Sequence, residues 1–358
     1  MLFEVSTRVQ QLSSMFADRS FVQHFIKRLW EVHAHHINSI AFIDCQCYLL
    51  RKTLAINLLA IVILSQGNCG LTTCTTRYLV AMAMTDLLFI ITGVLLWRIT
   101  FYYFLGSFLV ITPVCIVIAV MFRAATEFSV WFTVAFTFDR FMAICCQKLK
   151  TKYCTEKTAV VVLTTTSILL CVKNIPFYFA YEPLWIIDNI PWFCALKSNY
   201  YTDPEWVGLD WLDTLLTPLL PFALILLLNA LTVRHILVAS RIRKGLRGQS
   251  KGVNCSDPEM DSRRKSVILL FTISGSFMLL WLVYVIQFLY YIITGSEPGD
   301  YNDSEYMFKR FGYMLRTLSC CTNTFIYVVT QSKFREQFRI TVKYPVTSII
   351  QFMNKLSN

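Results

Sequence analysis

The chain has 358 residues, of which 56% are hydrophobic and only 15% are charged. Soluble domains carry about 25% charged residues and avoid large exposed apolar patches, so this composition argues against a soluble protein. The net charge of +11 need not indicate nucleic acid, because Lys and Arg gather in the cytoplasmic loops of membrane proteins. The thirteen cysteines show no spacing typical of a metal site.

Long apolar blocks dominate the chain, and about 20 apolar residues span a bilayer core. Residues 1–52 differ: they form an atypical N-terminal segment, and Arg51 and Lys52 interrupt the start of the first helix. Two adjacent cations in hydrocarbon are costly, so we expect that helix to be damaged there. Arg98–Val110 is expected to be an apolar outer loop or helix extension. The predicted spans are Leu54–Leu64, Tyr78–Trp97, one crossing between Trp97 and Asp139, Thr158–Ala180, Trp211–Val238, Ser266–Ile293 and Phe311–Thr330.

The loops predict how the chain is oriented in the membrane. The segments Asp139–Thr158 and Arg234–Lys265 are rich in Lys and Arg, whereas the segments that follow Ala180 and Ile293 carry acidic residues. With seven spans, this alternation places the N-terminus outside and the C-terminus in the cytosol of a multi-pass plasma-membrane protein. Asn302 begins an Asn-Asp-Ser sequon in a predicted outer loop, so we expect it to be glycosylated.

Several motifs follow one another in a recognisable order. Asp139-Arg140-Phe141, at the cytoplasmic end of the third predicted helix, resembles the D-R-Y motif of rhodopsin-like (class A) G-protein-coupled receptors. Taken alone, these residues could be a positive-inside anchor beside an acid. Asp86 ends a stretch similar to L-A-x-x-D, Trp281 is similar to the tryptophan of C-W-x-P, and Asn323-Thr324-Phe325-Ile326-Tyr327 is similar to N-P-x-x-Y. The resemblance covers about residues 53–338.

The resemblance implies an all-α membrane protein, a seven-transmembrane helix bundle at residues 53–332. A short amphipathic eighth helix and a cytoplasmic tail follow at residues 333–358. It also implies a receptor, not an enzyme, that binds an extracellular ligand and activates heterotrimeric G proteins through Asp139, Arg140 and Phe141. Within the class, the chain looks closest to the orphan, peptide-type receptors that respond to tryptophan and phenylalanine, which implies neuropeptide signalling.

The resemblance also assigns roles to individual residues. Cys115 and Cys194 match the two positions of the family's disulfide, with two buried free thiols as the alternative. A sodium ion at Asp86, or a protonated Asp86 paired with Asn57, would each satisfy this buried acid, and no other cofactor or metal is expected. The implied polar network comprises Asp86, Asn57, Ser129, Ser319 and Asn323. The implied activation switch comprises Trp281, Phe277, Pro221, Asn323 and Tyr327.

Some positions depart from the family pattern. Val283 and Thr324 replace the prolines of helices six and seven, and Asn229 replaces a tyrosine of helix five. The base of helix six carries the basic run Arg263–Lys265, where an acid commonly pairs with the arginine that Arg140 matches. These departures concern activation, so a receptor-like protein that no longer signals is one alternative function. A transporter is another, although no internal repeat is visible.

Ionisable side chains occupy the outer half of the predicted bundle, where such groups pair with one another or bind ligands. Arg123 and Glu127 are four residues apart on one helix and could neutralise each other. Alternatively, they line a polar pocket for a zwitterion or for the end of a peptide, and we favour a role for Arg123 there. The predicted ligand pocket comprises Arg123, Glu127, Asp213, Tyr284, Gln287 and Arg316.

Overall fold

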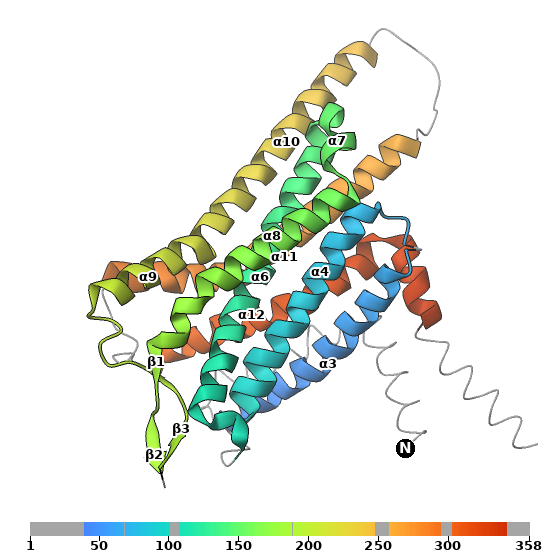
Figure 1. The fold of residues 1–358 in the computed structure, drawn as a ribbon. Helices are drawn as coiled ribbons and strands as arrows, with labels where there is room; N and C mark the ends of the chain where they lie inside the picture. Colours follow the sequence, from blue (N-terminus) through green and yellow to red (C-terminus); the bar gives the residue numbers. More distant parts are fainter. Residues whose placement is uncertain are drawn as a thin grey trace, which may run out of the picture.

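The computed structural model describes residues 39–67, 69–100, 107–187, 189–247, 258–294 and 303–341. The predicted glycosylation site at Asn302 lies outside these residues. The described chain is a bundle of long helices, shown in Figure 1. Its helices are α3 (Ser39–Ser65), α4 (Thr73–Phe89) with the π-helix η1 (Ile90–Ile99), the 3-10 turn η2 (Phe108–Val110), α6 (Thr112–Cys145), α7 (Gln147–Tyr153), α8 (Glu156–Asn174) with the 3-10 turn η3 (Ile175–Ala180), α9 (Pro204–Thr214), the π-helix η4 (Leu215–Leu219), α10 (Leu220–Arg247), α11 (Pro258–Thr294) and α12 (Asp303–Thr330).

Helix length and hydropathy fit a membrane protein. Five helical stretches are long and apolar enough to cross a bilayer: Thr73–Ile99, Thr112–Cys145, Glu156–Ala180, Pro204–Arg241 and Arg264–Gln287. The helices α3 and α12 have 27 and 28 residues. At 1.5 Å per residue each is about 40 Å long, which exceeds the ~30 Å hydrocarbon core. The described chain therefore has the predicted all-α, seven-helix architecture.

Four short strands lie between α8 and α9. Strand β1 (Tyr181–Glu182) pairs antiparallel with β4 (Ala195–Leu196), and β2 (Trp185–Ile187) pairs antiparallel with β3 (Ile190–Trp192). The β2–β3 hairpin lies at one end of the bundle and α7 lies at the opposite end (Figure 1). By the predicted orientation, the hairpin belongs to the outer end and α7 to the inner end.

The first helix is continuous. It begins at Ser39, inside the segment that the sequence assigns to the atypical N-terminus. Arg51 is exposed, and the Lys52 ammonium lies 5.4 Å from the centroid of the Tyr48 ring. A long side chain can lie along apolar surface and carry its charge outward, so the two cations do not break the helix.

The fifth span is interrupted, although the sequence predicts one helix over Trp211–Val238. It consists of α9, η4 and α10, and Thr217 inside η4 is extended, with φ −154° and ψ 96°. Pro218 follows directly. A residue that precedes proline is disfavoured in the helical region, because the proline ring crowds its backbone and Cβ.

Aromatic residues from α12 and the segment after it complete the inner part of the core. Residues 332–341 are helical, as the predicted eighth helix requires. Phe334 and Phe338 are buried in a core cluster with Tyr327, whereas Lys333 and Arg339 are exposed. This helix is therefore amphipathic. Elsewhere large apolar side chains face outward, for example Leu279, which is 72% exposed, as expected of a surface covered by lipid.

Candidate functional site

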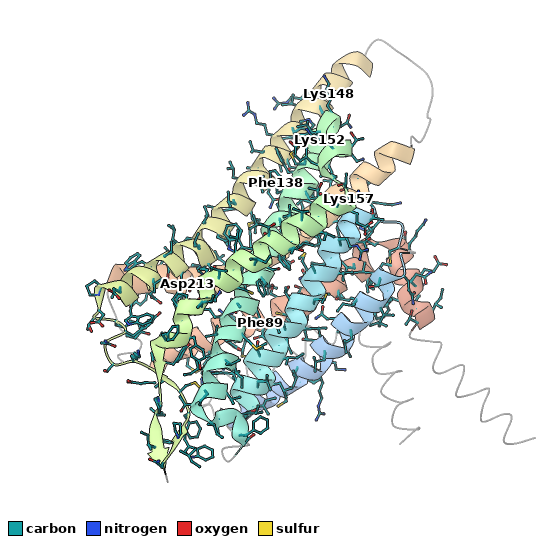
Figure 2. The ribbon with its side chains drawn as sticks, in the orientation of Figure 1. Phe89, Phe138, Lys148, Lys152, Lys157 and Asp213 are labelled. Atoms are coloured by element: carbon teal, nitrogen blue, oxygen red, sulfur yellow. A yellow bond between two sulfur atoms is a disulfide. The ribbon has the colours of Figure 1, made fainter. Side chains whose placement is uncertain are left out.

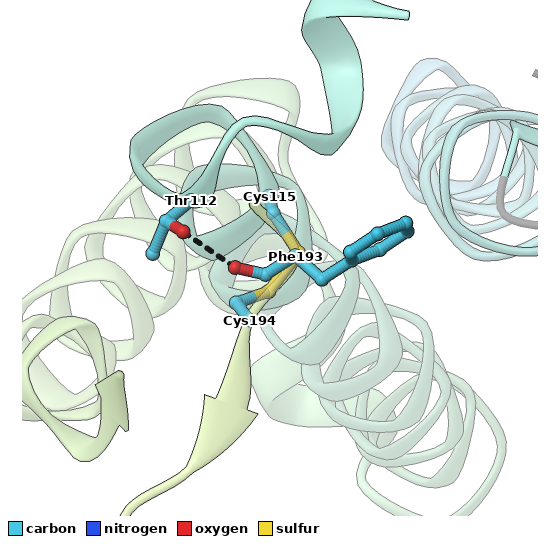
Figure 3. Close-up of a disulfide and its surroundings, with 4 residues drawn as sticks. All are labelled: Thr112, Cys115, Phe193 and Cys194. Atoms are coloured by element: carbon cyan, nitrogen blue, oxygen red, sulfur yellow. Dashed lines mark hydrogen bonds between the residues drawn. A yellow bond between two sulfur atoms is a disulfide. The ribbon is translucent and has the colours of Figure 1, made fainter. Parts of the chain in front are cut away.

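A disulfide joins the strand region to α6, as predicted. The Cys115 and Cys194 sulfurs are bonded, with a Cα–Cα distance of 5.9 Å. Beside it, the Thr112 hydroxyl donates a hydrogen bond to the Phe193 carbonyl oxygen at 2.6 Å (Figure 3). The Phe193 amide in turn donates to the Val110 carbonyl oxygen at 2.6 Å. These contacts fix the segment before β4 against the beginning of α6.

The Asp139-Arg140-Phe141 motif lies near the inner end of α6, where Phe141 is half-buried. Asp139 and Arg140 are buried and form an ion pair, in which Arg140 Nε donates to Asp139 Oδ2 at 3.0 Å. Arg140 Nη1 also donates to the Ser266 hydroxyl of α11 at 3.3 Å. Ser266, the residue that follows the basic run Arg263–Lys265, thus supplies a contact with α11 in place of the missing acid. Cys74 of α4 donates to Asp139 Oδ1 at 3.1 Å. The motif therefore links α4, α6 and α11.

Asp86 lies in the middle of the bundle and is buried. Its carboxylate accepts hydrogen bonds from the Ser129 hydroxyl at 3.2 Å and from Asn323 Nδ2 at 2.9 Å. Asn57 does not pair with Asp86 as one prediction required, because its amide donates instead to the Cys320 carbonyl oxygen at 2.9 Å.

Two further residues complete this region. The Thr324 hydroxyl donates to Asn57 Oδ1 at 3.2 Å, so Asn57 joins α3 to α12. Ser319 is buried on α12, one turn before Asn323, but no described hydrogen bond joins its side chain to Asp86. The predicted polar network is therefore two separate groups of hydrogen bonds, one centred on Asp86 and one on Asn57.

The predicted switch residues lie on α10, α11 and α12. Phe277 and Trp281 stack with ring centroids 5.1 Å apart, and Trp281 packs edge-on against Tyr284 at 5.8 Å. Pro221 is buried at the second position of α10. Tyr327 is buried against Phe334, with centroids 5.8 Å apart. The structure thus brings Phe277 and Trp281 into direct contact but places Tyr327 in a separate cluster nearer the inner end.

The residue that replaces the helix-five tyrosine has a specific partner. Asn229 Nδ2 donates to the Ser274 hydroxyl at 2.9 Å, and that hydroxyl also lies 3.2 Å from Asn229 Oδ1. Both residues are buried. This pair connects α10 to α11 at a position where a buried amide without partners would be costly.

Four charged side chains form one network between α6, α8 and α9. Arg123 Nη1 donates to Asp213 Oδ2 at 2.6 Å, and Lys173 Nζ donates to Glu127 Oε1 at 2.7 Å. Lys173 also pairs with Asp213, which Figure 2 labels. The predicted pair between Arg123 and Glu127 does not form, because each side chain pairs with an opposite charge on another helix. Two cations balance two anions, as burial of charge requires.

One member of this network and one of its neighbours were absent from the predicted ligand pocket. Lys173 is the cation that joins its two acids, and Asn174 Nδ2 donates to Glu127 Oε2 at 2.9 Å. The Arg123 guanidinium also lies 3.8 Å from the centroid of the Phe177 ring. A charge inside a predicted span was the available signal for Lys173. The sequence offers no comparable signal for Asn174.

Arg316 has a different environment from Arg123. It is 8% exposed, and its guanidinium lies 4.9–5.7 Å from the centroids of five aromatic rings. Gln287 is half-buried one turn outward of Tyr284 on α11. A Cβ added at Gly312 would lie 3.4 Å from Gln287 Oε1, so the small glycine lets α11 and α12 approach closely. The rings around Arg316 are Phe89, Phe122, Trp281, Tyr284 and Tyr313.

The end of the bundle opposite the β2–β3 hairpin is basic. Lys148 and Lys152 lie on α7, and Lys157 lies at the start of α8, all near the end away from the hairpin (Figure 2). Arg77 pairs with Glu156 at 2.6 Å, and both side chains are well exposed. The inner end thus presents exposed cations around the buried Arg140.

Comparison with known families is consistent with this geometry. The sequence model of the family described as 7 transmembrane receptor (rhodopsin family) matches residues 56–327 of the chain. The match spans most of the bundle, from within α3 to the last turn of α12.

Proposed function

Because the chain belongs to the rhodopsin family of seven-transmembrane receptors, we propose that it binds an extracellular ligand and activates a heterotrimeric G protein. The observation that carries the proposal is the environment of Arg140. It is buried, restrained by Asp139, and hydrogen-bonded to Ser266 of α11. A single side chain thus holds two helices together at the inner end, where a cytosolic partner would bind.

The proposed mechanism is a shift between two states. A ligand that binds the open state more tightly than the closed state raises the population of the open state. Opening separates α11 from α6, which breaks the contact between Arg140 and Ser266 and exposes the guanidinium to the G protein. The stacked pair Phe277–Trp281 lies on the same helix as Ser266 and can transmit a movement of α11.

The proposed ligand is a peptide or a small amino-acid-like molecule, bound in the outer half of the bundle. The charged network of Arg123, Glu127 and Asp213 forms one side of this region, and the rings around Arg316, with Gln287, form the other. Membership in the tryptophan- and phenylalanine-responsive group belongs to this proposal as well. It rests on the likeness of Asn57–Leu64, of Leu280-Trp281 and of the segment Asn323–Tyr327.

We propose further that Asp86 holds a sodium ion in the closed state. The residues fit this role, because hard cations are bound by oxygen ligands and Asp86 and Ser129 present carboxylate and hydroxyl oxygens together. When bound, the ion would neutralise a buried carboxylate. Asn323 would keep its hydrogen bond to that carboxylate, and Ser319 lies one turn away on α12.

The decisive experiment compares the chain with Arg140→Ala in transfected cells. Surface delivery is measured with an N-terminal epitope on unpermeabilised cells, which also tests the proposed outside location of the N-terminus. Basal G-protein activation is measured in parallel. Arg140→Ala is expected to abolish basal activation at equal surface level, and Arg77→Ala is the matched control. Arg77 is an exposed arginine at the same end, so its loss should leave activation unchanged.

Three outcomes would refute the proposal. Good surface delivery without any activation, basal or after ligand screening, would establish the silent receptor. Ligand-dependent flux in proteoliposomes without a G-protein response would establish a transporter. Activation that persists in Arg140→Ala would show that the buried ion pair does not control coupling.

A further inference from the structure

We propose that Arg316 is the binding site for a carboxylate group of the ligand, so that the ligand is an aromatic or apolar monoanion. The inference rests on the proposed function in one respect, that a ligand enters the outer half of the bundle. It goes beyond it by naming the residue and the chemical group that meet there.

The first step is that Arg316 carries an unpaired charge. Its side chain makes no ion pair and no hydrogen bond with any described residue, and its buried Nε has no partner. The guanidinium of arginine is a cation in proteins, so the unpaired group carries a full positive charge. Charged groups inside a membrane bundle ordinarily pair with one another or mark a binding path.

The second step is that the nearby acids are already occupied. Glu127 and Asp213 are neutralised by Lys173 and Arg123. Asp86 accepts hydrogen bonds from Ser129 and Asn323 and forms no ion pair with Arg316. The described part of the chain thus contains a balanced network on one side of the outer half and an unbalanced cation on the other.

The third step concerns the rings. Aromatic faces are electronegative, and they attract a cation within about 6 Å of their centroids. Five rings from α4, α6, α11 and α12 meet this condition around Arg316. A Cβ on Gly93 would collide with the Phe122 ring, so the glycine makes room for one of them. The rings attract the charge but do not neutralise it, and they cannot accept the forked, in-plane hydrogen bonds of the guanidinium.

The fourth step identifies the group. A planar fork of N–H donors matches a carboxylate or a phosphate in a bidentate manner. A phosphate monoester carries a charge of about −1.5 to −2 at neutral pH, whereas a carboxylate carries one. One unpaired cation between aromatic faces balances one negative charge. The aromatic surroundings also favour an apolar body next to the acid.

The fifth step is the charge at the outer end of the same helices. Lys309 lies two turns outward of Arg316 on α12 and is exposed. The Arg98 guanidinium lies 3.5 Å from the centroid of the Tyr313 ring, one of the rings around Arg316. Arg98 and Lys309 therefore add two cationic side chains on the outer side of Arg316.

The test compares two probes of one shape on purified, detergent-solubilised receptor. N-acetyl-phenylalanine carries a carboxylate, and N-acetyl-phenylalaninamide replaces it with a neutral amide. Thermal unfolding is followed in one salt buffer as each probe is titrated to millimolar concentration. The acid is expected to stabilise the receptor at a half-maximal concentration about tenfold to a hundredfold lower than the amide, as charged hydrogen bonds allow.

Two variants make the test specific. Arg316→Met is expected to abolish the preference for the acid and to leave the unliganded unfolding temperature equal or higher, since it removes an unpaired buried charge. Arg123→Met is the matched control, because it removes a buried arginine that is paired with Asp213. It is expected to lower the unliganded unfolding temperature and to keep the preference for the acid. Arg316→Lys is the second variant at this position, because it keeps the charge and loses the planar fork of donors; it should reduce the preference for the acid without abolishing it.

The proposal fails if acid and amide stabilise equally, if neither stabilises, or if Arg316→Met retains the preference. A purely structural Arg316, acting as a distant counter-charge for Asp86, would instead lower the unliganded unfolding temperature on substitution. Arg140-dependent basal signalling, measured on the same receptor, separates this failure from failure of the proposed function. If the receptor signals but shows no preference for the acid, only the proposed carboxylate site is refuted. If it prefers the acid but does not signal, only the proposed G-protein coupling is refuted.

Discussion

Replacing Glu127 by glutamine tests whether the outer charged network is balanced as the structure indicates. Glu127 is 1% exposed, and both of its oxygens accept hydrogen bonds, one from Lys173 and one from Asn174. The Glu127→Gln variant would keep one acceptor and lose the charge. Arg123, Lys173 and Asp213 would then carry a net positive charge inside the bundle.

The expected cost follows from burial. Removing one partner of a buried pair leaves an uncompensated charge and costs about 3–5 kcal/mol. The exposed pair Arg77–Glu156 is the internal reference, with side chains 55% and 44% exposed. Exposed pairs contribute about 0–1 kcal/mol, so Glu156→Gln should cost little. The two glutamate-to-glutamine changes are chemically identical and differ only in environment.

A double variant makes the reasoning refutable. Combining Glu127→Gln with Lys173→Met removes one charge of each sign and leaves the neutral pair Arg123–Asp213. The double variant should therefore unfold at a higher temperature than Glu127→Gln alone, when both are measured in one detergent with a thiol-independent dye. Additive losses, or equal costs for the variants at Glu127 and Glu156, would show that the four charges do not act as one network.

Three further predictions concern other parts of the molecule. Cys115→Ala opens a disulfide between residues 79 positions apart and should lower the free energy of unfolding by about 4.5 kcal/mol, seen as loss of surface receptor. Cys171→Ala, which removes an exposed free thiol, should be neutral. Asp86→Asn should abolish any rise in unfolding temperature when sodium chloride replaces choline chloride. Thr324→Pro should destabilise less than Thr317→Pro in the same thermal assay, because the carbonyl oxygen freed by the first change keeps the Asn57 amide as a partner.

The helices and the disulfide could be predicted because they follow from runs of apolar residues and from the spacing of residues along the chain. A run of apolar residues reports that a helix lies in lipid whatever its neighbours are. The position of Cys115 at the beginning of α6 follows from its spacing to Arg140 in a family pattern. The interruption at Thr217 was missed even though the proline beside it was visible, because hydropathy records polarity and not backbone angles.

The partners of buried charges could not be predicted. Arg123 and Glu127 lie four residues apart, which brings their side chains near each other on an isolated helix. Within the bundle each finds an opposite charge on another helix, Asp213 and Lys173 respectively. The placement of α8 and α9 around α6 decides which charges pair. That placement cannot be read from a single sequence. The five rings around Arg316 come from four helices and were unpredictable for the same reason.

At Thr324, where the family has a proline, side-chain hydrogen bonds to Asn57 are present instead. In an α-helix the amide of Thr324 donates to the Cys320 carbonyl oxygen, and a proline at that position would leave this oxygen without its donor. Here the Asn57 amide already donates to the same oxygen, and the Thr324 hydroxyl donates back to Asn57. A side chain of α3 thus reaches the point on α12 where the family places its kink. The link between the two helices is kept while the steric cause of the kink is gone. A movement of α12 relative to α3 would therefore break specific hydrogen bonds to Asn57.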